Sequence, residues 1–323
     1  MVNIGILGTA AIAKRSIIPA IEGLPAYFNL IGVASRDKNN ASCIANTLKK
    51  DTFVGYKSLL DYPKIDALYI PLPNSLHYKW VNEALDRGIN VLVEKSLACS
   101  LEEVLFLNKK AKTLNLVLIE NFQFRFHKQL QVIQNLVNSG EIGELRSLHI
   151  SFGFPPFEDK CNIRYSKELG GGALLDAGAY TIKIAQIFLG PNIDVLGASS
   201  FICQNNNIDL YGGGFLKERE GSKFANISFG FDNHYQCRIE LWGSLGKIIA
   251  DRIFTAPPDL EVTICLEKKK STKHISIQKC NHFKEMLIYF HQLIESRKNL
   301  NFEYEQNINQ ARLLEDFKKL SKI

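Results

Sequence analysis

The sequence predicts two domains of different architecture: an α/β domain with a doubly wound parallel sheet, then an α+β domain with a large, mostly antiparallel open sheet. A length of 323 residues is about twice that of an ordinary domain. Up to about residue 120, short and almost continuously apolar runs alternate with helix-length segments, which is typical of parallel strands buried on both faces. Further along the chain, apolar and polar residues alternate one by one, which is typical of strands with one face on a core.

The first domain is expected over residues 1–120 as a Rossmann-type fold. Repeated alternation of strands and helices implies right-handed crossovers between parallel strands. Ser100 and Glu103 have the spacing of a capping box at the start of a helix. The expected strands are 3–7, 30–34, 67–70, 91–93 and 116–119, and the clearest helices are 75–87 and 100–114.

The second domain is expected over residues 121–304, and we assign substrate binding and dimerisation to it. Three helices, at 127–138, 177–189 and 282–297, are expected on one face of its sheet. An amphipathic helix over 305–322 is a candidate to pack back on the first domain. The expected strands are 148–154, 195–203, 225–231, 237–241, 247–250, 260–266 and 273–277.

Composition excludes several classes of protein. Hydrophobic residues make up 46% and charged residues 22%, which is ordinary for a globular protein. No uncharged stretch reaches the roughly 20 residues that a membrane helix needs. The seven cysteines are odd in number and never spaced as CxxC, which argues against a zinc site or a disulfide framework. We therefore expect no metal, no membrane and a reducing, cytoplasmic location.

Charge indicates little about partners. Lys and Arg number 39 against 33 Asp and Glu, a formal excess of +6. The only dense basic run is Lys268 to Lys270, and a nucleic-acid-binding protein would carry several such clusters interleaved with aromatic residues. An exposed hairpin explains this run, so no nucleic-acid partner is expected. A mild positive field suits small anionic ligands such as phosphates.

A candidate dinucleotide-binding turn follows the first strand. Gly8, Thr9, Ala10 and Ile12 lie where a GxGxxG fingerprint would stand, with alanines at the second and third glycine positions. Small residues still let the backbone approach a pyrophosphate at a helix N-terminus. The alternative is an ordinary strand–turn–helix connection.

The end of the second strand indicates which dinucleotide is bound. A carboxylate there would bind the ribose 2′-hydroxyl of NAD, but this chain has Ser35 and Arg36. A hydroxyl followed by a guanidinium suits a 2′-phosphate, which favours NADP(H) over NAD(H). The alternative is a solvated turn in which Asp37 caps a helix.

Two further strand ends carry candidate ligand-binding residues, because doubly wound sheets bind ligands at the carboxyl ends of their strands. After the third predicted apolar run comes a PxPNxxH segment, and after the fourth comes a Glu-Lys pair. Lysine beside glutamate could offer a cation near a reacting carbonyl. The residues concerned are Leu72, Pro73, Asn74, His77, Glu94 and Lys95.

The most distinctive segment of the second domain is GGGALLDAGAY, in which Asp176 and Tyr180 are four residues apart. On a helix they would share a face. Arg164 precedes the three glycines, which would let the backbone come close to a neighbour. The alternative makes Asp176 the N-cap of helix 177–189 and Tyr180 a packing residue.

With these motifs combined, the whole chain resembles the glucose–fructose oxidoreductase / inositol dehydrogenase (Gfo/Idh/MocA) family. Many members carry histidine where this chain has Tyr180. The tyrosine version is most similar to the branch that contains dihydrodiol and xylose dehydrogenases, sugar-nucleotide ketoreductases and glucose–fructose oxidoreductase itself. The chain departs from the family pattern at Ser96, where a proline usually follows the Glu-Lys pair, and this leaves Lys95 less rigidly placed.

The resemblance implies a role for each matching residue. Tyr180 would be the acid/base for a hydroxyl–carbonyl pair, assisted by Lys95, with chemistry in the cleft between the domains. Asp176 and Arg164 would bind substrate. Asn74, His77 and Glu94 would line the nicotinamide end of NADP(H). It also implies oligomerisation, as a dimer or tetramer, through the open sheet.

The expected function is an NADP(H)-dependent oxidoreductase acting on a secondary alcohol or ketone of a sugar or sugar nucleotide. Aldose 1-dehydrogenase and trans-dihydrodiol dehydrogenase activities stay open, as does an enzyme that keeps NADP tightly bound and cycles it between two sugars. A non-catalytic NADPH-binding sensor is the alternative from another class. Retention of Lys95 and Tyr180 argues against it.

Overall fold

The computed structural model describes residues 1–39, 51–159 and 161–322. The chain folds into two compact units. The first unit consists of Met1–Asn121 with Phe283–Ile308, and the second consists of Phe122–His282 with Asn309–Ile323. Both units are therefore built from two separate stretches of chain.

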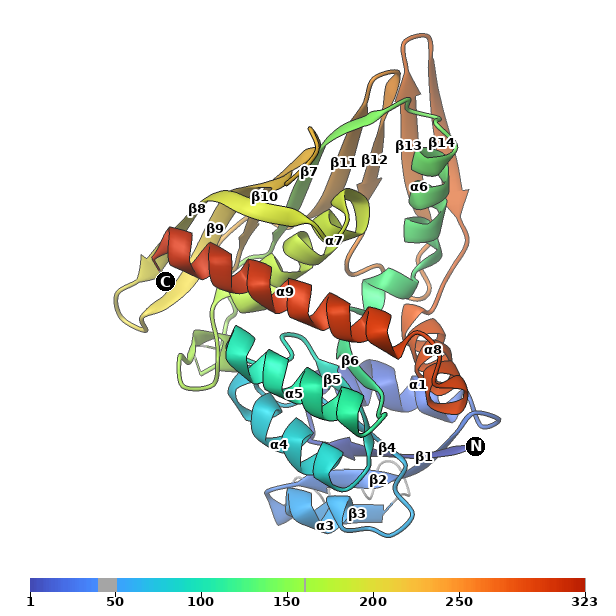
Figure 1. Ribbon diagram of the computed structural model, residues 1–323, viewed down its shortest axis with the longest axis vertical. Coiled ribbons are helices and arrows are strands. Elements are labelled where there is room, and N and C mark those ends of the chain that lie inside the picture. Colours follow the sequence, from blue (N-terminus) through green and yellow to red (C-terminus); the bar gives the residue numbers. More distant parts are fainter. Residues whose placement is uncertain (40–50, 160, 323) are drawn as a thin grey trace. The chain divides into compact units, whose positions relative to one another are not determined.

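The first unit contains a six-stranded parallel sheet in the order β3-β2-β1-β4-β5-β6 (Figure 1). Strand β1 pairs with both β2 and β4, so the direction of winding reverses there, as the doubly wound prediction requires. The five predicted strands are confirmed, while the short edge strand β3 was missed. The strands are β1 (Val2–Leu7), β2 (Phe28–Ser35), β3 (Asp51–Val54), β4 (Ala67–Ile70), β5 (Asn90–Glu94) and β6 (Leu118–Asn121).

Helices cover this sheet. The capping box at α5 forms, because Ser100 Oγ accepts a hydrogen bond from Glu103 N and Glu103 Oε2 accepts one from Cys99 N. Helices α4 and α5 pack against each other and lie side by side in Figure 1. The helices are a π-helical turn (Ala13–Ile17) continuing into α1 (Ile18–Glu22), then α3 (Tyr56–Leu60), α4 (Asn74–Asp86), α5 (Leu101–Thr113), α8 (His282–Ser296) and the first part of α9 (Leu300–Ser321).

The predicted position of α8 was wrong. We expected it on the sheet of the second domain, but nearly all of it belongs to the first unit. Its His291 ring meets Tyr27 and Phe28 edge-on, with ring centroids 5.1 and 5.6 Å apart. An apolar stripe shows that a helix packs on a core, but not which of two cores it meets.

The second unit contains an eight-stranded sheet in the order β14-β13-β12-β11-β7-β10-β9-β8. Neighbouring strands are antiparallel except for the parallel pair β7 and β10. The predicted strands are confirmed, but β9, with three consecutive glycines, was missed. The strands are β7 (Leu145–Gly153), β8 (Ile193–Cys203), β9 (Ile208–Glu218), β10 (Phe224–Gly230), β11 (Gln236–Gly243), β12 (Gly246–Asp251), β13 (Val262–Lys268) and β14 (Ser271–Ile277).

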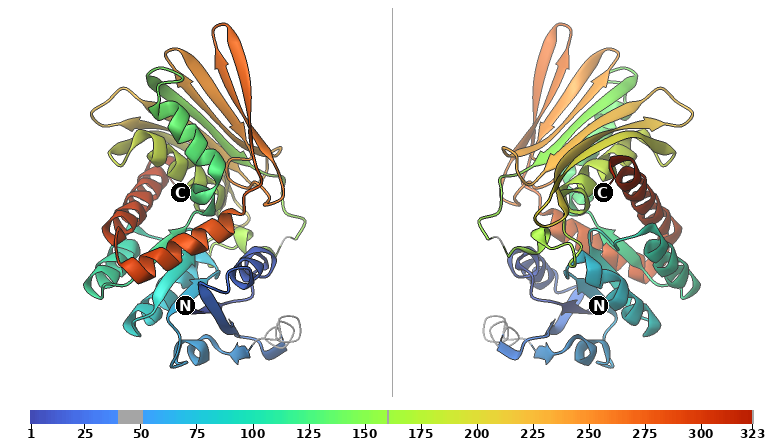
Figure 2. Two further views of the ribbon diagram at one scale, coloured as in Figure 1. Left: turned by 90° about the vertical axis from the view of Figure 1, so that its right-hand side faces the viewer. Right: turned by 90° about the vertical axis from the view of Figure 1, so that its left-hand side faces the viewer.

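Helices α6 (Lys128–Asn138) and α7 (Ala179–Leu189) cover one face of this sheet (Figure 2). The core lies between them and the strands, and it includes the inward-facing residues of β7, β10 and β11. In the part of the chain that the structure describes, no helix covers the opposite face. That open face carries the exposed rings of Phe201, Tyr211 and Trp242.

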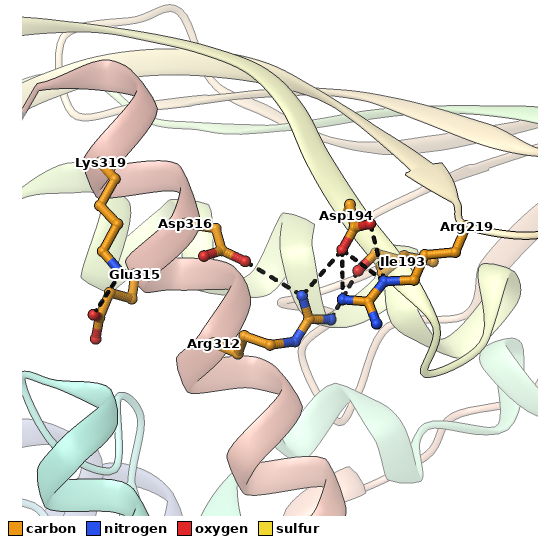
Figure 3. A network of polar contacts seen from close by, with 7 residues as sticks. All are labelled: Ile193, Asp194, Arg219, Arg312, Glu315, Asp316 and Lys319. Carbon is orange, nitrogen blue, oxygen red and sulfur yellow. Dashed lines mark hydrogen bonds and ion pairs between the residues drawn. The ribbon is translucent and has the colours of Figure 1, made fainter.

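Helix α9 is shared by the two units. In its first part, Tyr304 Oη donates to the Leu116 carbonyl, and Asn307 Nδ2 donates to Asn108 Oδ1 and to the Leu118 carbonyl of β6. In its second part, Arg312 contacts Asp194, which also forms a two-point contact with Arg219 (Figure 3). The helix begins earlier than the expected residue 305, because its start continues the packing of the first unit.

Candidate active site

The turn after β1 brings backbone close to the loop after β4. Gly8 has φ +129°, a conformation that favours glycine, and a Cβ placed there would lie 2.8 Å from Leu72 Cδ2. Thr9 and Ala10 are partly exposed, and a helix starts immediately after them. Ile12, the second residue of that helix, is partly buried. The turn places a helix N-terminus at the carboxyl end of β1, with Ala10 in place of a fingerprint glycine, and pyrophosphate binding there stays a prediction.

Ser35 and Arg36 lie at the end of β2. Ser35 is buried, and its Oγ accepts a hydrogen bond from Asp37 N at 3.3 Å. The Arg36 side chain is exposed, and its guanidinium lies near the hydroxyl of Tyr56 on α3. Burial raises the pKa of Tyr56, partly offset by this guanidinium. Tyr56 was not predicted from the sequence, because only the folded chain shows that α3 begins beside the end of β2.

Glu94 is the centre of a polar cluster at the carboxyl ends of β4, β5 and β6. Its Oε1 accepts hydrogen bonds from Tyr69 Oη at 2.6 Å and from Asn121 Nδ2 at 2.7 Å. Burial raises the pKa of Glu94, and the two hydrogen bonds and Lys95 act in the opposite direction. Tyr69 and Asn121 thus immobilise the residue that precedes Lys95. A tyrosine in a fully apolar strand needs a partner for its hydroxyl, which is the signal that could have identified Tyr69.

His77 joins two of the strand-end loops. Its ring is fully buried, with Nδ1 2.7 Å from the Ser96 carbonyl and Nε2 2.7 Å from the Leu72 carbonyl. Burial lowers the pKa of His77 to about 4, and the two carbonyls act in the opposite direction. Ser96 follows a cis peptide bond and is itself buried. The sequence predicted that serine leaves Lys95 loosely placed. That prediction did not include the contact by which His77 fixes the Ser96 carbonyl.

Near His77, Pro73 is the N-cap of α4 and Asn74 is its first residue, and both are partly buried. Contact of His77, Asn74 and Glu94 with the nicotinamide end of a cofactor stays a prediction.

Tyr180 lies in a cage of aromatic rings in the second unit. Its side chain is buried, and its hydroxyl donates a hydrogen bond to Gln123 Oε1 at 3.2 Å. Four rings surround it at centroid distances of 5.2 to 5.7 Å, contributed by Phe122, Phe124, Phe152 and Phe254. None of these five neighbours was predicted from the sequence as a site residue, although the pattern Phe122-Gln123-Phe124 puts an amide between two rings.

Asp176 forms an ion pair with Arg164. Arg164 Nε lies 2.5 Å from Asp176 Oδ2, and the guanidinium carbon lies 4.8 Å from the Phe157 ring centroid. Asp176 is inside the helical turn Leu174–Gly178 that leads into α7, so the alternative that made it an N-cap is wrong. The structure therefore brings together two of the three residues predicted to bind substrate.

Asp209 on β9 fixes the start of this helical segment by a hydrogen bond. It was not predicted from the sequence as a site residue. Its Oδ2 accepts a hydrogen bond from Leu174 N at 2.5 Å. A Cβ on Gly172, whose φ is +109°, would overlap Asp209 Oδ1. Burial raises the pKa of Asp209. The close approach of this carboxylate thus explains part of the glycine run. Asp209 lies on β9, the strand that the alternation of apolar and polar residues did not predict.

Within the described ranges, no group of three or more His, Cys, Asp or Glu side chains is arranged to hold a metal ion. Searching the same residues for a helix both long and apolar enough to cross a membrane finds none. None of the six cysteines that the structure describes is part of a disulfide.

Comparison with known proteins covers most of the chain. Residues 2–122 match a family model for the oxidoreductase family with an NAD-binding Rossmann fold, and residues 130–249 match the GFO/IDH/MocA C-terminal domain. A dTDP-3,4-didehydro-2,6-dideoxy-α-D-glucose 3-reductase from Saccharopolyspora spinosa is 41% identical over 276 residues, which is 85% of this chain and 82% of that protein. A D-xylose 1-dehydrogenase (NADP⁺) from Haloferax volcanii is 30% identical over 96% of this chain and 94% of that protein.

Among solved structures, KijD10, a 3-ketoreductase from Actinomadura kijaniata in complex with NADP and TDP-benzene, superposes with a TM-score of 0.94 at 31% identity. The match covers 98% of this chain and 97% of that one.

Proposed function

Because this chain belongs to the GFO/IDH/MocA family of oxidoreductases, we propose that it is an NADP(H)-dependent reductase of a ketone on the sugar ring of a sugar nucleotide. The observation that carries this proposal is the full-length similarity to a 3-ketoreductase that was crystallised with NADP and a TDP derivative. The 3-reductase from S. spinosa supports the same reaction class at higher identity.

The residues after β1 and β2 fit NADP(H). The Gly8 turn and the helix N-terminus behind it would take the pyrophosphate, because N–H groups at a helix N-terminus attract anions. Arg36, supported by Tyr56, and the hydroxyl of Ser35 would bind the 2′-phosphate. When bound, NADPH supplies the hydride that reduces the ketone carbon.

Tyr180 supplies the proton. Reduction of a ketone leaves an alkoxide, and the Tyr180 phenol donates its proton to that oxygen and becomes a phenolate. The ordinary pKa of tyrosine is about 10, so the phenolate needs stabilisation near neutral pH. We assign that role to the Lys95 cation, which would also stabilise charge on the substrate oxygen. The hydrogen bonds of Glu94 and His77 support the loop that carries Lys95.

Arg164 and Asp176 would bind the sugar. A guanidinium held by both a carboxylate and an aromatic face presents a cation in a defined position. Asp176 Oδ1 would accept from a ring hydroxyl.

The protein is proposed to assemble through the open face of its eight-stranded sheet, with a second copy of the chain as the partner. Phe201 and Tyr211 are stacked there at 5.1 Å with an angle of 8° between the rings. They border a hollow of about 430 Å³ that is also lined by Ser199, Ser228 and Asn233. An uncovered sheet face with exposed rings is typical of an interface. The odd number and scattered spacing of the cysteines support a reducing, cytoplasmic compartment.

One assay separates the alternatives. The purified protein is given NADPH with a dTDP-linked 3-keto-6-deoxy sugar, and separately NADP⁺ with D-xylose, D-glucose or a trans-dihydrodiol. We expect loss of NADPH absorbance with the keto sugar nucleotide and at least tenfold lower rates with the others. A preference for D-xylose would instead support the activity named for the H. volcanii relative.

The same preparation tests the two remaining alternatives. Cofactor that survives gel filtration would support the tightly bound form. The absence of turnover across the panel would support the non-catalytic sensor and contradict the reductase.

A further inference from the structure

Three consecutive residues after β6 contact Tyr180, and the middle one is polar. Phe122 and Phe124 contact its ring, and Gln123 Oε1 accepts a hydrogen bond from its hydroxyl at 3.2 Å. Gln123 lies on a turn of 3₁₀ helix, Gln123–Phe126, and its side chain is 7% exposed. The surroundings are otherwise strongly aromatic, so this amide is a polar group placed directly on the phenol.

We propose that Gln123 is a positioning residue for Tyr180. At rest, the Gln123 amide oxygen accepts a hydrogen bond from the phenol. During proton transfer, the amide group is flipped by about 180°, and its N–H donates a hydrogen bond to the phenolic oxygen. The proposal rests on the proposed function, because it takes Tyr180 as the proton donor. Gln123 acts on the substrate only through Tyr180.

The need for the rotation follows from the direction of the phenolic proton. In the observed arrangement, that proton points at Gln123 Oε1 and is not available to a substrate oxygen. When Gln123 Nε2 faces Tyr180 instead, its N–H donates to the phenolic oxygen, and the phenol can direct its own proton to the alkoxide. The Tyr180 O–H bond then breaks, the O–H bond of the alcohol forms, and Nε2–H stabilises the phenolate that remains.

Glutamine suits this role because the two ends of its amide have nearly the same shape but opposite hydrogen-bonding character. A phenolate among four phenylalanine rings has lost most of its hydration, so a donor to it contributes more than a donor in water would. Methionine would fill the same space without a donor. Glutamate would keep the shape but, when ionised, could only accept.

The test measures the phenol directly and needs only NADP⁺ as ligand. Tyrosinate absorbance is followed from pH 6 to 11 with NADP⁺ bound, and the curve of Tyr180→Phe is subtracted to isolate Tyr180 among the 11 tyrosines. We expect Gln123→Met to raise the pKa of Tyr180 by about one unit or more, which corresponds to the loss of a hydrogen bond to a charged group. Gln123→Glu should raise it further, because a negative charge is added.

Gln186→Met is the matched control. Gln186 is buried on the same α7 helix and bonds Gln310, so its replacement also removes a buried glutamine but not a contact to the phenol. Its Tyr180 titration should equal that of the wild type. A wild-type titration in Gln123→Met would overturn the proposal, as would a lowered pKa in Gln123→Glu. If Gln123→Met does not fold, the isosteric Gln123→Glu carries the test.

Turnover separates this inference from the proposed function. With the substrate that the assay above identifies, Gln123→Met should lower kcat about 10- to 100-fold, because the stabilising bond to the phenolate is lost. In a plot of kcat against pH, the alkaline limb of Gln123→Met should move in the same direction as its Tyr180 titration. If Tyr180→Phe keeps full turnover, the proposed acid/base role fails whatever the titration shows. If Tyr180→Phe loses turnover while Gln123→Met keeps it, only the role of Gln123 fails.

Discussion

The cluster around Glu94 and the cage around Tyr180 hold their central residues by opposite means. Glu94 is held by directional hydrogen bonds from Tyr69 and Asn121, at the ends of parallel strands. Tyr180 is held mainly by the shapes of four rings, with Gln123 on its hydroxyl. A hydrogen-bonded site should be sensitive to the loss of one polar atom, whereas a packed site should be sensitive to volume. The following predictions test that difference, beginning with the largest effect.

Removal of the Tyr180 hydroxyl should have the largest consequence. Tyr180→Phe keeps the ring in its cage but removes the proton donor, so kcat should fall about 10²- to 10⁴-fold. NADPH affinity, measured by fluorescence titration, should stay within twofold of the wild type. Turnover close to the wild-type value would remove Tyr180 from the mechanism.

A cavity in the cage should reduce the stability of the second unit. Phe254 is fully buried against Phe124, Phe152 and Tyr180, so Phe254→Ala should lower the free energy of unfolding by about 3–5 kcal/mol. The exposed Phe302 is the matched control, and Phe302→Ala should change it by less than about 0.5 kcal/mol. Urea unfolding measures both. Equal effects would mean that the cage is not closely packed.

The cofactor preference should depend on Arg36. Arg36→Ala removes a guanidinium from the proposed 2′-phosphate position, so the Kd for NADPH should rise about tenfold or more while the Kd for NADH changes little. The exposed Lys64 provides a control for simple loss of charge. A similar loss of NADH affinity would contradict the assignment of Arg36 to the 2′-phosphate.

Acid should weaken the fold through buried histidines. Burial lowers the pKa of His127 to about 4 and that of His282 to about 3, against an ordinary value of 6.5. The unfolded chain therefore binds protons that the folded chain does not, and the stability present above pH 6.5 is lost as pH falls from about 6.5 toward 4. The Tm should fall steadily over that range, and His127→Gln should make the fall shallower. An identical pH dependence in that variant would contradict the assignment.

The smallest effect is expected at Tyr69. Tyr69→Phe removes one of the two described side-chain donors to Glu94 but keeps the packing, so the free energy of unfolding should fall by about 1 kcal/mol. We expect kcat to fall only a few-fold, because Asn121 still holds Glu94. Steady-state kinetics and urea unfolding check both values. A loss as large as that of Phe254→Ala would mean that the polar cluster has no redundancy.

The spacing of apolar residues and the capping residues at helix ends predicted most of the architecture, because buried strands and amphipathic helices each require a characteristic spacing of apolar residues. The same reasoning found Lys95, Asp176 and Tyr180 as candidates. It failed where a long-range partner decides the outcome. The apolar stripe of α8 fits either core, β9 is interrupted by glycines, and Asp209 and Gln123 acquire their roles only from what the fold places against them.

The route of the chain sets the order in which the protein can be completed during synthesis. The first unit begins at residue 1, yet its β6 strand is hydrogen-bonded by Asn307 and the residues just before that strand by Tyr304. During synthesis the strands of the parallel sheet emerge well before α8 and the start of α9, and most of the second unit is made in between. The first unit is therefore completed only after most of the second unit has been synthesised, and the segment after residue 308 then completes the second unit. A fragment that stops at residue 121 would leave the buried edge of β6 uncovered.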